Sequence, residues 1–194
     1  ISSSVASSCY KRQCLDCFIV SLLHLDSYNI YWRSLNTRDD GIPSNRARIV
    51  FVGILRLHDN GSFVFPAATR PLDIRQFLDP RRGRPSFADL PPLSATTARD
   101  HVTHFLHEIE ASGSDPFFEP WIIDCDSSPP FTKALLGISP CITRGRCKGH
   151  WITSMGRRMN LPEALRMQGF DDNFENPVTE RQLRMMLGNS MSLN

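Results

Sequence analysis

Apolar residues recur at helical spacing near the start of the chain and then change to a strand-like pattern. From Cys14 to Leu25 they form a broad stripe that predicts an amphipathic helix. From Tyr28 to Leu35 aromatic and β-branched residues alternate with polar ones, which predicts a half-buried strand. Ile49 to Leu55 is an uninterrupted apolar run of strand length, as expected for a strand buried on both faces.

Prolines crowd the middle of the chain, from Asn60 to about Pro130, and predict a lobe built mostly of loops. Short helices are expected within it over Leu72 to Leu78 and over Thr97 to Ala111, where apolar residues return at helical spacing. Trp121 to Cys125 predicts a strand.

The last third of the chain carries clear helix boundaries. Asn160 followed by Glu163 has the spacing of a capping box, and Gly169 suits the end of that helix. The same spacing recurs from Thr179 and predicts a second helix that ends at Gly188.

Length and composition add broad limits. The 194 residues suit one ordinary domain, or a small core with an appended lobe. No signal peptide and no apolar run of membrane-spanning length is found, and six cysteines without a secretory signal favour reduced thiols inside a cell. Because the first residue is Ile1, we expect the chain to lie within a longer reading frame or to follow a cleavage.

A net charge of +2 does not by itself indicate nucleic-acid binding, but the basic residues are clustered. Two compact loops hold six of the 22 Lys and Arg residues, and solvated loops are the plain alternative. These residues are Arg81, Arg82, Arg84, Arg144, Arg146 and Lys148.

Arg46 and Arg48 are the sharpest chemical candidates. They lie between two predicted strands, where α/β sheets commonly place working residues. Two guanidinium groups there can hold an anionic backbone or a base carbonyl through forked hydrogen bonds. Taken alone, the pair is more typical of surface arginines that flank a strand.

Two groups of residues of metal-binding types are weaker candidates for a functional site than the arginine pair. No second cysteine pair at zinc-finger spacing accompanies the first group, and the second group needs ligands from elsewhere, so we expect no metal site. The groups are Cys9, Cys14 and Cys17, and His101, His104 and His107.

Two distant parts of the chain, one near its start and one near its end, resemble in this order the C-terminal half of a cytosine-C5 DNA methyltransferase. Residues 41–48 are similar to the family's Gly-(Val/Ile)-Pro loop with Gln-x-Arg-x-Arg, with Ser44 in place of the Gln. Residues 157–170 resemble the penultimate motif, Arg-x-Leu-Thr-x-x-Glu-x-x-Arg-Leu-Gln-Gly-Phe, which chiefly braces the recognition lobe. Residues 188–191 resemble the final Gly-Asn-(Ala/Ser)-Val turn.

The resemblance implies an α/β fold: the C-terminal part of a Rossmann-like S-adenosylmethionine-dependent methyltransferase plus a loop-rich target-recognition lobe. Residues 1–59 would end the catalytic core, 60–156 would form the lobe, and 157–194 would return to the core. Arg48 would contact a flipped cytosine and Arg46 would support the site. Asn189, Ser190 and Met191 would border the S-adenosylmethionine pocket, and the six clustered basic residues would bind double-stranded DNA.

Three parts of such an enzyme are not found in this sequence: a Phe-x-Gly-x-Gly turn, the Pro-Cys nucleophile in its Gly-Pro-Pro-Cys-Gln context, and Glu-Asn-Val. Cys141 follows a proline but lies downstream of the arginine loop, so a nucleophilic role is not expected. We expect the chain alone to be inactive, to need an upstream half of the same enzyme, and to leave an open apolar edge.

The leading hypothesis is therefore a C-terminal fragment of a DNA (cytosine-5-)-methyltransferase, which methylates a cytosine flipped out of the duplex. A non-catalytic DNA-binding or regulatory module is the alternative, favoured by Ser44 and by the absent nucleophile. A zinc-bearing interaction domain built on the cysteine group is the third. One branch of the family modifies tRNA, although the sizeable lobe favours DNA. A nuclear location is expected in a eukaryotic host and a cytoplasmic one otherwise, without a membrane partner.

Overall fold

The computed structural model describes residues 14–192 and divides the chain into two compact units. The hairpin unit comprises the described residues up to Leu35 together with Arg48–Ala67. The lobe unit comprises Asn36–Ala47 and the described residues from Ala68 onward. The predicted boundaries near residues 59 and 156 stay predictions.

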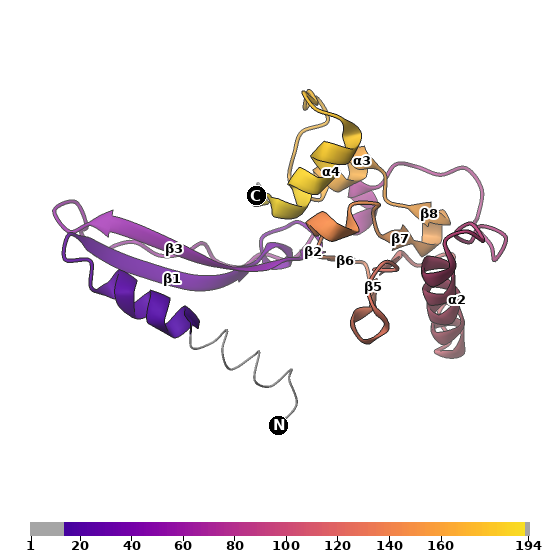
Figure 1. The fold of residues 1–194 in the computed structure, drawn as a ribbon, viewed down its shortest axis with the longest axis horizontal. Coiled ribbons are helices and arrows are strands. Elements are labelled where there is room, and N and C mark those ends of the chain that lie inside the picture. The colour runs from indigo at the N-terminus through magenta and orange to yellow at the C-terminus, as the bar shows by residue number, and fades with distance from the viewer. Residues whose placement is uncertain (1–13, 193–194) are drawn as a thin grey trace. The chain divides into compact units, whose positions relative to one another are not determined.

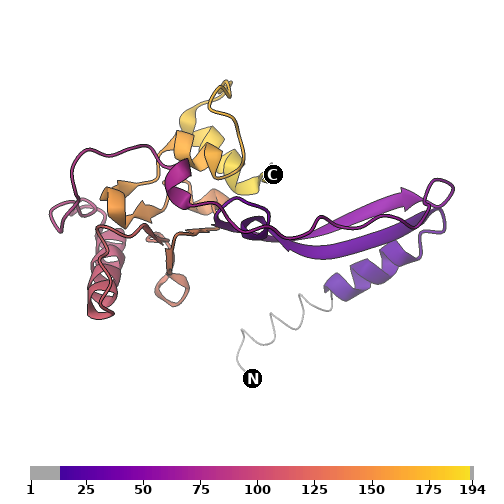
Figure 2. The same cartoon turned by 180° about the vertical axis from the view of Figure 1, so that it is seen from behind.

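The hairpin unit consists of a helix over residues 14–23 and the strands β1 (Tyr28–Asn36) and β3 (Ala47–Leu55), which pair as a two-stranded sheet (Figure 1). The strands are antiparallel, since the backbone N–H after β3, at Arg56, donates to the carbonyl before β1, at Ser27. Seen from behind, the helix runs along the hairpin (Figure 2). Phe18 and Phe51 meet edge to face, with ring centroids 5.4 Å apart. The helix and both strands are confirmed.

The expected burial of β3 on both faces is wrong within the described residues. Ile49 and Leu55 are each 40% exposed, because β3 has a single neighbouring strand and the helix covers part of one face. Other large apolar side chains of this unit, such as Trp32, are also exposed. The open apolar edge itself stays a prediction.

The lobe unit is organised around a four-stranded antiparallel sheet in the order β5-β4-β7-β8. A separate parallel pair joins β2 to β6 and aligns Ser44 with Ser139. The strands are β2 (Ser44–Asn45), β4 (Trp121–Ile123), β5 (Ala134–Leu136), β6 (Ser139–Pro140), β7 (Trp151–Ile152) and β8 (Arg157–Arg158). The α-helices are α2 (Thr96–Ala111), α3 (Leu161–Arg166) and α4 (Glu180–Asn189). Single 3₁₀ turns are η1 (Thr37–Asp39), η2 (Ile74–Phe77), η3 (Pro129–Phe131), η4 (Arg144–Arg146) and η5 (Thr153–Met155).

Two hydrophobic cores occupy opposite faces of this sheet. Successive residues of a strand point to opposite faces, so Ile122 enters one core and Ile123 the other. Ile122 and its neighbours across the sheet pack with Ala164 of α3 and Leu187 of α4. Ile123 packs against α2. The first core therefore joins β4 and β7 to the C-terminal helices α3 and α4.

The predicted helix boundaries hold at the N-terminal ends. The Asn160 side chain accepts from the Glu163 N–H at 2.9 Å, and the Glu163 carboxylate accepts from the Asn160 N–H at 2.8 Å, which confirms the capping box. The capping box at Thr179 is confirmed as well. Gly169, with φ of 82°, lies just beyond α3 in the left-handed region that ends helices.

Three expected elements differ from the structure. The helix expected over residues 72–78 is only the 3₁₀ turn η2, capped by the Asp73 carboxylate. The strand expected over residues 121–125 ends at Ile123, because the buried Asp124 turns away into polar contacts. Helix α4 continues through Gly188 to Asn189. No helix in the described range is both long and apolar enough to cross a membrane.

Candidate functional site

Arg46 is a buried residue that links distant segments of the lobe unit. Because β2 runs parallel to β6, the residues that follow the two strands lie side by side, and the Arg46 side chain reaches residues 141 and 142. Nη1 donates to the Ile142 carbonyl at 2.9 Å and approaches the Cys141 Sγ at 3.4 Å. Nη2 donates to the Gly188 carbonyl at 3.4 Å and to the Ser190 carbonyl.

Arg48 has a different environment. It is an exposed residue of β3 and belongs to the hairpin unit, whereas Arg46 is 2% exposed in the lobe unit. Of the predicted pair, Arg48 is therefore the exposed residue and Arg46 the buried one. Ser44, at the position of the family's Gln, is fully buried in β2. The catalytic roles of both arginines stay predictions.

The Gly188–Ser190 turn comprises the last two residues of α4 and the residue after them, and Asn189 and Ser190 border one end of a groove. Asn189 is exposed, Met191 is 56% exposed, and the Ser190 N–H donates to the Met186 carbonyl at 2.9 Å. An open groove of about 430 Å³ reaches Asn189 and Ser190, and its walls are otherwise apolar. These walls are Phe170, Phe174, Leu183, Met186 and Leu187.

Gly188 lies directly against the backbone of η4. A Cβ at this position would stand 2.1 Å from the Arg144 nitrogen and 2.4 Å from the Thr143 carbonyl carbon. Glycine at residue 188 is thus required by close approach of α4 to this loop. The packing brings the basic loop and the Gly188–Ser190 turn together.

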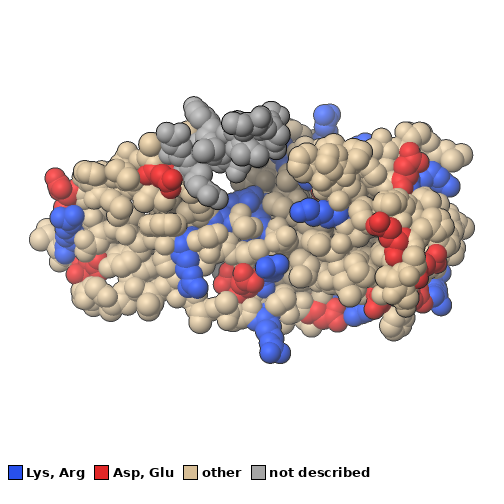
Figure 3. Space-filling model, turned by 90° about the horizontal axis from the view of Figure 1, so that it is seen from below, with Lys and Arg blue, Asp and Glu red and all other residues tan. Residues whose placement is uncertain are grey.

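The six basic residues predicted to bind DNA fall into two classes. Arg81 pairs with Asp89, Arg84 with Asp115 and Arg146 with Asp124. The other three are exposed, and no carboxylate of residues 14–192 forms an ion pair with them: Arg82, Arg144 and Lys148. On the face shown in Figure 3, Lys and Arg side chains are interspersed with Asp and Glu. DNA binding by all six stays a prediction.

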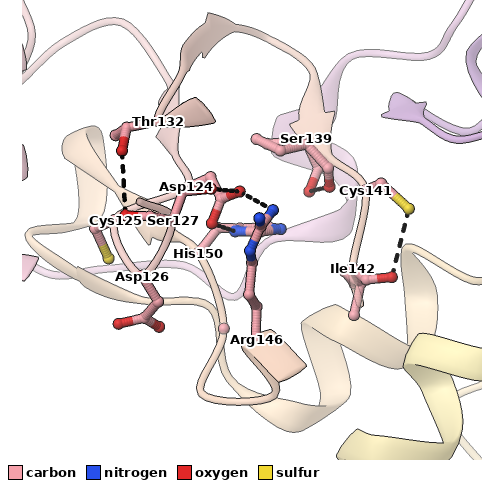
Figure 4. A network of polar contacts seen from close by, with 12 residues as sticks. Asp124, Cys125, Asp126, Ser127, Thr132, Ser139, Cys141, Ile142, Arg146 and His150 are labelled. Atoms are coloured by element: carbon pink, nitrogen blue, oxygen red, sulfur yellow. Dashed lines mark hydrogen bonds and ion pairs between the residues drawn. The ribbon is translucent and has the colours of Figure 1, made fainter. Parts of the chain in front are cut away.

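A buried polar network lies beside β4 and was not predicted from the sequence. Asp124 accepts hydrogen bonds from Ser127 Oγ at 3.1 Å and from Arg146 Nη1, and its Oδ1 lies 3.6 Å from His150 Nδ1 (Figure 4). Burial lowers the pKa of His150 below its ordinary value of 6.5, against the opposing effect of Asp124. An acid directly after an apolar strand was the available sequence signal.

The segment 157–170 holds the loop that contains Asp79. Arg157 donates through both terminal nitrogens to the fully buried Glu163, at 2.7 and 2.9 Å. Arg166 donates to Asp79 at 2.7 Å. Hydrogen bonds from Asn160 and then from Arg166 lower the pKa of the Asp79 carboxyl. These contacts are structural, as expected for this motif.

The cysteines and histidines singled out by sequence are dispersed. Cys9 lies outside the described residues, while Cys14 and Cys17 are exposed. Burial raises the pKa of Cys125 to about 11. The His101 ring lies within hydrogen-bond distance of the Cys125 carbonyl, at 3.0 Å. His104 and His107 contact glutamates of their own helix, α2. Within residues 14–192, no three His, Cys, Asp or Glu gather where a metal ion could be held.

Comparisons with known proteins agree with the motifs. A family model described as C-5 cytosine-specific DNA methylase matches residues 6–114 and 133–194. The type II methyltransferase M.NgoBI of Neisseria gonorrhoeae is 31% identical over 170 residues, covering 86% of this chain and 48% of that protein. M.HaeII of Haemophilus aegyptius is 28% identical over 175 residues, with the same shares covered. The chain thus spans about half the length of these curated relatives.

A solved structure is similar as well. The Entamoeba histolytica methyltransferase EhMeth aligns with a TM-score of 0.56 and 18% identity, covering 94% of this chain and 55% of that one. Together with the family match, this likeness gives the chain a mixed α/β methyltransferase-like fold.

Proposed function

Since this chain belongs to the family of C-5 cytosine-specific DNA methylases, we propose that it forms the C-terminal part of a DNA (cytosine-5-)-methyltransferase. In this proposal it supplies the end of a Rossmann-like core and the target-recognition lobe. The parent enzyme methylates C5 of a cytosine that has left the base stack.

One observation carries the proposal. Arg46 of the arginine loop and Ser190 of the final motif are 144 residues apart in sequence, yet the arginine donates to the Ser190 carbonyl. Two separately weak motifs therefore meet in the folded chain. A chance resemblance of short sequences gives no reason for such a contact.

S-adenosylmethionine, the family's methyl donor, fits the groove at the end of α4 in chemical character. Apolar and aromatic walls suit the adenosyl group, and the exposed Asn189 offers an amide donor and acceptor at the rim. When bound, the cofactor supplies an electrophilic methyl group. Asn189, Ser190 and Met191 would border it from this chain, and other parts of its pocket would come from the upstream half.

The remaining roles follow from exposure and charge. The exposed Arg48 would donate to the flipped base, and Arg144 and Lys148 would contact DNA phosphates. The attacking cysteine would come from a Gly-Pro-Pro-Cys-Gln sequence upstream, since Cys141 follows the arginine loop and lies in a Ser-Pro-Cys-Ile-Thr context.

The test is to express the complete reading frame that contains this chain and to supply S-adenosylmethionine with a tritiated methyl group. We expect labelling of duplex DNA containing cytosine and its loss in Arg48→Gln. Transfer to tRNA alone would change the substrate class. Tight DNA binding by a folded protein without any methyl transfer would instead establish the non-catalytic module.

A further inference from the structure

We propose that Arg46 is a positioning residue for the cofactor edge of the site: its guanidinium clamps the backbone on both sides of Asn189. The inference rests on the proposed function, since it assigns Arg46 to the S-adenosylmethionine side of the reaction. It separates this arginine from Arg48, which would serve the base.

The acceptors of the hydrogen bonds that Arg46 donates define the clamp. Nη2 donates to the carbonyls of Gly188 and Ser190, which are the residues directly before and after Asn189. Nη1 is anchored on the Ile142 carbonyl at 2.9 Å. A planar guanidinium directs several donors at fixed angles, so one side chain holds both carbonyls against a third segment.

The end of α4 is a favourable place for this charge. Carbonyls in the last turn of a helix have no intrahelical partner, and the helix dipole makes that end negative. Arg46 is 2% exposed, so its interaction with these carbonyls is little weakened by water. The cation therefore replaces solvent as the partner of the helix end.

Further hydrogen bonds, made by Ser192, hold the same turn. Ser192 Oγ lies 3.2 Å from Thr37 Oγ1 and donates to Gln168 Oε1 at 3.1 Å. The Thr37 N–H in turn donates to the Arg46 carbonyl at 3.3 Å. Both the backbone and the side chain of Arg46 thus connect to the segment that carries Asn189.

The functional consequence concerns affinity for the cofactor. When the clamp is removed, the Asn189 backbone gains freedom that cofactor binding must then restrict. Affinity for S-adenosylmethionine falls, whereas the approach of Arg48 to a cytosine is unchanged. A residue that acted on the base would instead change the rate of methyl transfer.

The first experiment needs no cofactor. Amide hydrogen exchange is measured in the complete protein that contains this chain and in its Arg46→Lys, Arg46→Met and Arg48→Met variants. We expect the Ser190 amide, which donates to the Met186 carbonyl, to exchange about tenfold faster in Arg46→Met and less so in Arg46→Lys. Amides of α2 report the global fold and stay unchanged. Equal acceleration in α2, or an unchanged Ser190 amide, would overturn the clamp.

The second experiment uses the complete enzyme. Arg46→Lys is expected to raise KM for S-adenosylmethionine about tenfold with kcat within about twofold, since the order lost around Asn189 weakens binding equally in the ground state and the transition state. Arg48→Lys is expected to lower kcat instead. A fall in kcat for Arg46→Lys with an unchanged KM contradicts the inference.

Two precautions keep both experiments decisive. If the Arg46 variants do not fold, Ser192→Ala removes the bridge between Thr37 and Gln168 and tests the same turn. It is expected to accelerate exchange at Ser190 and to raise the same KM. If the complete wild-type protein methylates nothing, the proposed function fails, while the exchange measurement still decides whether Arg46 holds the turn.

Discussion

Gly188 and Arg144 approach each other so closely that only a hydrogen fits between the α-carbon of one and the backbone nitrogen of the other. The contact joins α4 to η4, and neither backbone can yield as a flexible side chain would.

Gly188→Ala is therefore expected to destabilise the chain by about 3 kcal/mol, since overpacking against fixed backbone displaces a helix or a loop. Urea unfolding measures the loss. Gly145→Ala is the matched control, because nothing lies within 4 Å of a Cβ there, and its effect should stay within about 0.5 kcal/mol. Equal stabilities of the two variants would contradict the close approach.

Glu163→Gln is expected to cost about 2 kcal/mol of unfolding free energy, because it removes the charge of a fully buried carboxylate that accepts two hydrogen bonds from the half-buried Arg157. The same measurement on Glu180→Gln provides the comparison. Glu180 is exposed and pairs with Arg184 along α4, so its loss should cost under about 0.5 kcal/mol. A Glu163 variant as stable as the Glu180 variant would show that the Glu163 carboxylate is not buried in solution.

The pH dependence of the unfolding free energy should reflect the protonation of His150. Its pKa in the folded chain lies below the ordinary value, so the unfolded chain binds the proton more readily. Stability is then complete above about pH 6.5 and falls as the pH is lowered through that value. The groups that face the imidazole are Asp124, Asp126, Arg146 and the Cys141 backbone.

Thermal unfolding at pH 7.5 and pH 5.5 tests this dependence in wild type and His150→Gln. The variant should lose less stability between the two values. An identical fall in wild type and His150→Gln would exclude His150 as its origin.

DNA-binding measurements should distinguish the residues of the basic loop that contact DNA from the one that stabilises the fold. Arg144→Gln and Lys148→Gln are each expected to weaken binding to duplex DNA and to reduce the salt slope by about 1, as loss of one phosphate contact does. Arg146→Gln should mainly lower stability, because it removes a partner of the buried Asp124. A reduced salt slope for Arg146→Gln at full stability would reverse this division.

The sequence was most informative where structure depends on near neighbours. The capping boxes at Asn160 and Thr179 involve residues three positions apart, and α2 follows from its apolar spacing. Each of these signals is local, so a single chain displays it in full.

Contacts between distant residues were beyond the same reasoning. The Arg46 side chain reaches Ile142 and Ser190 only because β2 pairs with β6. The burial of β3 was overestimated because an apolar run does not state how many strands or helices lie beside it. Asp124 gave a weak hint after its strand, but its partners Arg146 and His150 follow only from the fold.

The sheet with two cores has a consequence for divergence. Ile122 and Ile123 are neighbours in sequence, yet they serve separate packing groups, and substitutions in groups without shared contacts have nearly additive effects. The core that packs against α2 can therefore accumulate substitutions over evolutionary time while the core beneath α3 and α4 keeps its packing. A lineage of such proteins can alter one side of this sheet without rebuilding the other.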